Sequence, residues 1–498
     1  MQNYWDLIFL NPILIVVALV SIFFMLKNEK TDLKRKLIYL EIFLFWFAAA
    51  LIIKVVTWET SLHLVFENSN LFFTLIVFFG INFVAIIFKP IATLVTGKLK
   101  SRRLWYWISN ATLFMGAILA LLNFAILKEP NFITLYFSLI LIGFSLSANT
   151  LHYLIVCEQT FYRLNPIGST ITVASMMLFG NFIANYTFAL VSIYQVSYQV
   201  QTLLCLVIIA SVLAFGLSFV YKENSNYVGT FSFQFRSELD SFKYIYVIYL
   251  SLATFVIVFI SEISGGLFFE EYLKIILVNH SKISTIEIYL RLNQSLYYLP
   301  QIFFGYLIYK MVLPQMGYKY HFITNLLCLA IWLSIIGFLK NPIMIILFQF
   351  LITMAVAQIF YGLFALAVMW NYRIQNFPVT GIVASSGILA TFICEGVIRS
   401  LQKNKVWIFN YDSDIQSLVD NPDLKQIQDH YFVAWNIGMS ILASLTMVLI
   451  LIFYFTIDKV LSNYVDVRQA NLDMIKLNHS QTLQRAETRI VEKEKTNV

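Results

Sequence analysis

The stretch YRLNPIGSTITVAS at residues 162–175 recurs 210 residues later as YRIQNFPVTGIVAS at residues 372–385. Six of the fourteen paired positions are identical, and two more pair Leu with Ile or Asn with Gln. Each copy connects two long apolar segments, and six such segments separate equivalent points of the two copies. Because six spans return a chain to the same side of a membrane, the repeat predicts two six-helix halves in the same orientation.

The composition around the repeat is that of a membrane protein. Of the 498 residues, 59% are hydrophobic and 12% are charged, and the mean hydropathy is +0.76. The apolar residues fall into blocks of about twenty, the length that a helix needs to cross ~30 Å of hydrocarbon. The blocks predict thirteen membrane-spanning helices: Leu7–Leu26, Leu37–Val56, Leu71–Val95, Leu104–Leu127, Phe132–Val156, Ser169–Val191, Gln201–Tyr221, Tyr244–Phe268, Glu287–Val312, His321–Leu339, Ile343–Met369, Val379–Ser400 and Phe432–Ile457.

The charges of the connecting loops predict the orientation. With the N-terminus outside, the inside loops and the C-terminal tail hold 23 of the 34 basic residues, as the preference of Lys and Arg for the cytoplasmic side requires. We therefore expect a multi-pass plasma membrane protein with an outside N-terminus and a cytoplasmic C-terminus. The predicted organisation is an extra helix with its basic loop (1–36), two six-helix bundles (37–221 and 244–457) around a cytoplasmic loop (222–243), and a cytoplasmic tail (458–498).

One cytoplasmic loop, GKLKSRR at residues 97–103, carries four basic residues in seven. It resembles the loop signature of the major facilitator superfamily, G-x-x-x-D-(R/K)-x-G-x-(R/K)-(R/K). Lys98, Arg102 and Arg103 match its basic positions, whereas Gly97 replaces the acid. In the equivalent second loop Lys310 matches and Tyr309 replaces the acid.

The resemblance covers residues 37–457 and implies two parallel six-helix bundles that transport small molecules. It also implies that basic residues at the cytoplasmic ends take part in a gate, although the loops also fit simple topological anchors. The missing acid puts the strength of such a gate in doubt. The candidate gate residues are Lys98, Arg102, Arg103, Arg163, Lys310 and Arg373.

Polar side chains inside the predicted helices are the main functional candidates, because ionisable groups at mid-bilayer are costly unless they face protein or water. Several follow helical spacing, such as Glu395 and Arg399 at i and i+4. The family resemblance places these helices around a central cavity. The candidate cavity residues are Lys54, Asn149, His152, Arg291, Gln294, Tyr298, Gln358, Tyr361, Glu395 and Arg399.

Plainer interpretations exist for several of these residues. Glu395 and Arg399 are suitably spaced for an internal ion pair. Arg291 is near the outer end of its helix and suits a snorkelling arginine, and His152 suits a hydrogen-bonded packing residue. Glu262 has no basic neighbour one turn away, so we expect it to carry a coupling proton or to pair with Arg291 or Lys54.

Motifs for other functions are absent from the sequence. There is no GxxxxGK[ST] phosphate loop, no HExxH or GxSxG motif and no basic face typical of nucleic-acid binding. We therefore predict no enzyme, no metal and no cofactor, and no nucleic-acid partner. The predicted function is secondary active transport of a small polar solute, anionic or zwitterionic, by alternating access with proton coupling. A transporter-like scaffold without transport and a lipid flippase remain alternatives, and whether the extra first helix or the tail binds a protein partner is left open.

Overall fold

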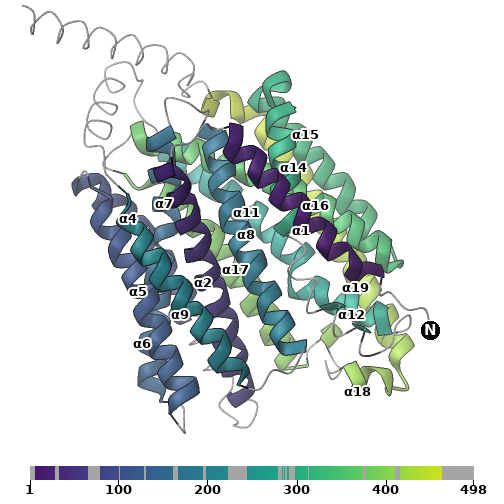
Figure 1. Cartoon of the computed structure of the whole chain (residues 1–498). Coiled ribbons are helices and arrows are strands. Elements are labelled where there is room, and N and C mark those ends of the chain that lie inside the picture. Colours follow the sequence, from purple (N-terminus) through teal and green to yellow (C-terminus); the bar gives the residue numbers. More distant parts are fainter. Residues whose placement is uncertain are drawn as a thin grey trace, which may run out of the picture.

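The computed structural model of the chain describes residues 6–28, 33–64, 79–99, 101–127, 131–160, 166–193, 198–221, 244–278, 283, 285–286, 289–290, 298–311, 313–373, 377–405, 407–409 and 415–461. These residues form a bundle of helices, and no strand occurs among them (Figure 1).

The helices divide by sequence into a first helix and two halves. The first helix is α1 (Asp6–Asn28). The N-terminal half contains α2 (Leu33–Leu64), η1 (Phe79–Phe83) with α4 (Val84–Leu99), α5 (Arg103–Leu121) with η2 (Leu122–Ile126), α6 (Phe132–Ser145) with α7 (Ala148–Thr160), α8 (Pro166–Ile193) and α9 (Gln199–Ser218). The C-terminal half contains α11 (Tyr244–Gly265) with α12 (Leu267–Val278), α14 (Tyr298–Met311), α15 (Leu313–Ile336), α16 (Pro342–Arg373), α17 (Val379–Lys403), η3 (Trp407–Phe409), α18 (Ile415–Val419) and α19 (Leu424–Leu461).

Eleven stretches of these helices are long and apolar enough to cross a membrane. The two remaining predicted spans coincide with α1, which has a shorter apolar stretch at Ile15–Lys27, and with α14, of which fourteen residues are described. The prediction of an all-α, multi-pass membrane protein is therefore confirmed.

The predicted end of the span Tyr244–Phe268 is wrong. The chain breaks at Gly266 and then continues as α12 to Val278, so Glu270 and Lys274 lie in a helix and not in a loop. A second break, at Leu146 and Ser147, separates α6 from α7. Both breaks fall in helices that supply polar side chains to the interior.

The two halves pack against each other through reciprocal pairs of helices. Within the halves, α2 packs on α8 as α11 packs on α17, and α5 packs on α9 as α15 packs on α19. Between the halves, α4 contacts α17 and α8 contacts α14. The second helix of each half thus meets the fifth helix of the other, which is the relationship expected for two copies related by a pseudo-twofold axis.

The additional helix α1 lies across the contact between α8 and α14. Ala18 of α1 is fully buried in one cluster with Phe182 of α8 and Leu299 of α14. The opposite side of α1 exposes Phe23 and Phe24, as a lipid-facing surface does. This helix therefore touches both halves, and in Figure 1 it crosses the front of the bundle from the N-terminus.

Candidate functional site

The break between α11 and α12 places two carboxyl groups on either side of a glycine. Glu262 lies in the last turn of α11 and Glu270 in the first turn of α12. A Cβ atom at Gly266 would lie 2.4 Å from the carbonyl oxygen of Glu262, closer than real Cβ contacts allow. The bend thus depends on a residue without a side chain.

Helix α17 presents three polar side chains to this break. Thr391, Glu395 and Arg399 follow one another at intervals of four residues, so they share one face of the helix. The hydroxyl of Thr391 donates a hydrogen bond of 2.9 Å to Oε1 of Glu262. This contact joins α17 to α11 at the predicted coupling residue.

The N-terminal half contributes Lys54 from α2. Its ammonium group interacts electrostatically with Glu270, Glu395 and Arg399. Lys54 and these three side chains, like that of Glu262, are all half-buried. We call the five residues Lys54, Glu262, Glu270, Glu395 and Arg399 the charge cluster.

The charges of this cluster do not balance. Lys54 and Arg399 supply two positive charges, and the three glutamates supply three negative charges when all are ionised. Among the described residues the polar partner of Glu262 is the neutral Thr391, and its charged neighbour is Glu395, which has the same sign. Glu262 is therefore the carboxylate in excess, and Lys54 is engaged with other acids.

Tyr298 extends the cluster to the contact between α14 and α8. The tyrosine is hydrogen-bonded to Asn185 of α8 and lies within the electrostatic reach of Glu262, Glu270 and Glu395. Because α14 and α8 belong to different halves, Tyr298 senses both the cluster and the position of the opposite half.

Gln358 and Tyr361 of α16 lie in the packed interior of the C-terminal half. Both are buried against Gly305 of α14. The Nε2 atom of Gln358, the hydroxyl of Tyr361 and both polar atoms of Gln349 have no hydrogen-bond partner among the described residues. Buried polar atoms are unfavourable when left unpaired, so these are groups that a polar solute would satisfy.

His152 belongs to a separate polar network inside the N-terminal half. Its Nδ1 accepts a 3.3 Å hydrogen bond from Nε1 of Trp46, and its Nε2 lies 3.5 Å from Oε2 of Glu41. Tyr106 and Asn110 of α5 both donate to the same carboxylate, the latter at 2.9 Å. The buried Glu41 is the centre of this network.

The remaining predicted residues divide into those that the structure describes and those that it does not. Asn149 is half-buried in the first turn of α7. Arg291, Gln294 and Arg163 lie outside the described residues, as do the side chains of Lys310 and Arg373. Their part in a site therefore stays a prediction.

The predicted gate loop lies next to a tight contact between the halves. A Cβ at Gly381 of α17 would lie 2.6 Å from the carbonyl oxygen of Lys89 on α4, and Ser385 Oγ donates a 2.7 Å hydrogen bond to the carbonyl oxygen of Ile86. In the loop itself, Arg102 is buried, whereas the guanidinium of Arg103 lies 4.2 Å from the ring centroid of Trp107. Lys98 is exposed, and the gate role of these three residues stays a prediction.

Sequence reasoning missed Glu41, Glu270 and Gln349. Glu270 has a local signal, because the apolar face of Leu267–Val278 continues past the two preceding glycines. Glu41 and Gln349 have none, since their environment is made by other helices. In the described part of the chain, no group of three or more His, Cys, Asp or Glu residues has the geometry of a metal site.

Comparisons with known proteins address the fold. No protein-family model matches the sequence, and no curated protein matches it significantly. Among solved structures, the human organic anion transporter MFSD10 matches with a TM-score of 0.53 and 10% identity over 85% of this chain and 100% of that chain. The proton:xylose symporter XylE matches with a TM-score of 0.55 and 13% identity over 83% of this chain and 94% of that chain.

The nucleoside transporter NupG matches with a TM-score of 0.50 and 12% identity over 83% of this chain and 100% of that chain. At such identities the likeness concerns the fold, and it confirms at that level the resemblance drawn from the two signature loops. The helix order, the reciprocal contacts between the halves and these solved structures together show that the chain has the fold of major facilitator superfamily transporters.

Proposed function

We propose that the protein is a secondary transporter that moves a small polar solute across the plasma membrane by alternating access, with an outside N-terminus. The observation that carries the proposal is the charge cluster, which takes Lys54 from one half and four residues from the other. Charged side chains shared between two halves of such a fold change their surroundings whenever the halves rock. A site of this kind links solute binding to conformation.

The charge imbalance supports proton coupling at Glu262. With Glu262 neutral the cluster has two positive and two negative side chains, and with Glu262 ionised it carries one excess negative charge beside Glu395. A proton on Glu262 therefore removes like-charge repulsion in a setting that contains little water. The hydroxyl of Thr391 stays within hydrogen-bond distance in either form, because a hydroxyl can donate or accept.

The polar atoms of the interior favour a solute with several hydrogen-bonding groups and a charge. The amides of Gln349 and Gln358 and the hydroxyl of Tyr361 offer both donors and acceptors. The mixed signs of the cluster suit a zwitterion or an anion that carries hydroxyl groups. The solved proteins of the same fold are described as transporters of organic anions, xylose and nucleosides, all of them polar solutes.

The proposal is tested with the purified full-length protein in liposomes that contain a pH-sensitive dye. A panel of amino acids, sugars, organic acids and nucleosides is added under an inward proton gradient, and each solute is scored for proton entry and for uptake of its labelled form. We expect one solute class to produce both signals. Proton entry with every solute or with none contradicts the proposal and favours a scaffold.

The role of Glu262 is tested with Glu262→Gln, which keeps the size and the hydrogen bond to Thr391. Proton-driven accumulation should disappear, whereas exchange of labelled for unlabelled solute should continue, because exchange needs no net release of a proton. Glu271→Gln is the matched control, since Glu271 pairs with Lys274 at 2.8 Å on the same helix as Glu270 and is outside the cluster. Loss of both activities in Glu262→Gln, or of neither, refutes the coupling role.

A further inference from the structure

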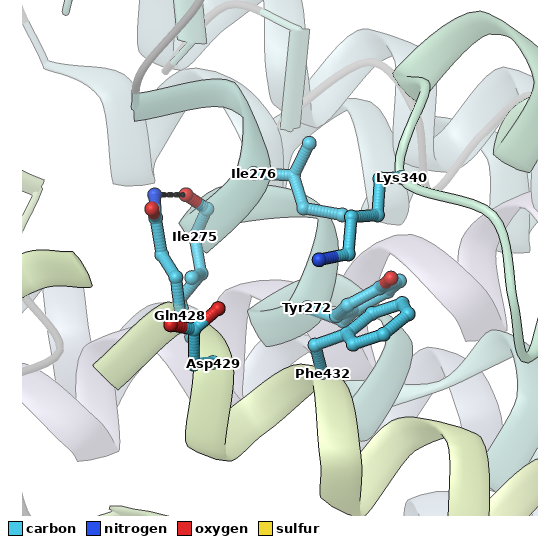
Figure 2. A pocket seen from close by; sticks show the side chains of 7 residues that line it. All are labelled: Tyr272, Ile275, Ile276, Lys340, Gln428, Asp429 and Phe432. Atoms are coloured by element: carbon cyan, nitrogen blue, oxygen red, sulfur yellow. Dashed lines mark hydrogen bonds between the residues drawn. The ribbon is translucent and has the colours of Figure 1, made fainter. Parts of the chain in front are cut away.

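A small pocket lies away from the charge cluster, among the end of α12, the connection between α15 and α16, and the start of α19 (Figure 2). Its volume is about 130 Å³, below the several hundred Å³ typical of sites for drug-sized ligands. The pocket is lined by Tyr272, Ile275, Ile276, Lys340, Gln428, Asp429 and Phe432. Loop charges assign this end of the helices to the outside of the membrane.

The walls of the pocket are held in place by contacts between elements. The ring of Tyr272 stacks on Trp435 with centroids 4.6 Å apart, and its hydroxyl donates a 2.7 Å hydrogen bond to the carbonyl oxygen of Leu339. Gln428 Nε2 donates a 2.9 Å hydrogen bond to the carbonyl oxygen of Ile275. The pocket is thus pre-formed, and little ordering is needed when a ligand enters.

Two opposite charges face this pocket without being paired to each other. The ammonium of Lys340 lies 4.2 Å from the ring centroid of Phe432, and Asp429 precedes Phe432 by one helical turn. Figure 2 shows Lys340 above the aromatic rings and Asp429 beside Gln428 on the other side of the pocket. Within the described chain, neither Lys340 nor Asp429 has an ion-pair partner.

We propose that this pocket binds a small zwitterion, with its carboxylate at Lys340 and its ammonium at Asp429. Lys340 keeps donors free beyond its contact with Phe432, and the Oε1 atom of Gln428 is a further acceptor, because its Nε2 is used by Ile275. The short carbon chain of the ligand lies against Phe432 and Ile276. An ion with a single charge satisfies one side of the pocket and leaves the other unpaired, so it binds more weakly.

The test uses the full-length protein in detergent and three probes of nearly equal shape. γ-Aminobutyrate carries both charges, butyrate carries the carboxylate alone, and butylammonium carries the ammonium alone. We expect γ-aminobutyrate at millimolar concentration to raise the unfolding temperature saturably, with an apparent affinity at least tenfold higher than that of either other probe. Equal effects of the three probes, or no effect of γ-aminobutyrate, overturn the proposal.

Variants then locate the binding. Lys340→Gln and Asp429→Asn should each weaken γ-aminobutyrate binding at least tenfold, and combining Lys340→Asp with Asp429→Lys should restore part of it. Lys425→Gln is the matched control, because Lys425 is exposed on α19 outside the pocket. If the control loses as much affinity, or if Glu262→Gln abolishes binding while the Lys340 variant retains it, the ligand is elsewhere and the proposal is wrong.

Discussion

Gly381 of α17 is a point of direct backbone contact between the two halves, and replacing it by alanine should force them apart. A Cβ at this position would lie 2.6 Å from the carbonyl oxygen of Lys89 and 2.6 Å from the Cα of Pro90. Ordinary contacts of a Cβ atom begin near 3.4 Å. Both atoms belong to the backbone of α4, so no side-chain rotation relieves the clash, and α17 and α4 must separate by about 1 Å.

The expected size of the effect follows from two opposing contributions. Overpacking of a well-packed contact costs about 1–3 kcal/mol, whereas Gly to Ala inside a helix gains about 1 kcal/mol. Gly387, also on α17, separates the two, because its Cβ would lie 3.5 Å from Val258 Cγ2, an ordinary contact. The difference between Gly381→Ala and Gly387→Ala is therefore the cost of the clash, equivalent to about a 5- to 150-fold change in an equilibrium.

The assay measures how often this contact opens. Ser385 is buried one turn beyond Gly381 and bonds to α4, so Ser385→Cys reports on the same contact. In a background without the four native cysteines, the rate of labelling by a water-soluble maleimide follows the open population. Gly381→Ala should label about 5- to 150-fold faster than Gly387→Ala. Equal rates in the two variants would refute the conclusion that this contact holds the halves together.

Three further predictions concern stability and transport. Lys89 is buried on α4 without an ion pair among the described residues, so Lys89→Met should stabilise the protein by up to about 3 kcal/mol, seen as a higher unfolding temperature in detergent that Lys89→Arg does not reproduce. Glu41→Ala removes the acceptor of Tyr106 and should destabilise the N-terminal half by about 3–5 kcal/mol, whereas Glu41→Gln should destabilise it less in the same melting experiment because its amide oxygen still accepts. Glu270→Gln should lower the rate of solute uptake severalfold in liposomes through lost interaction with the cluster, and Glu271→Gln should leave that rate unchanged.

The helices themselves were predictable because apolar length is a local property of the sequence. Hydropathy failed at Leu267–Val278, where Glu270, Glu271 and Lys274 fall within five residues and lower the average. Their spacing nevertheless leaves an apolar face that packs into the core, with Phe269 and Leu273 buried. A moment along the helix is the signal that would have found α12, since an average over all faces loses it.

The site was predictable only as far as one helix can show it. Spacing within α17 indicated that Glu395 and Arg399 share a face with Thr391, and Glu262 was identified because its own helix offers it no base. The donors that hold the carboxylate of Glu41 lie 65 and 69 residues away in sequence, at Tyr106 and Asn110. No local pattern contains such a pairing, because it is created when α5 packs against α2.

Helix α17 connects the charge cluster to the contact that closes the opposite end. Gly381 and Arg399 are eighteen residues apart on this helix, which corresponds to about 27 Å at 1.5 Å per residue. A helix of this length moves as a rigid rod, so a tilt that separates Gly381 from α4 also shifts Glu395 and Arg399 relative to Lys54 on α2. Because Thr391 ties the same helix to Glu262, the protonation of one carboxyl group and the closure at Gly381 act on a single mechanical element.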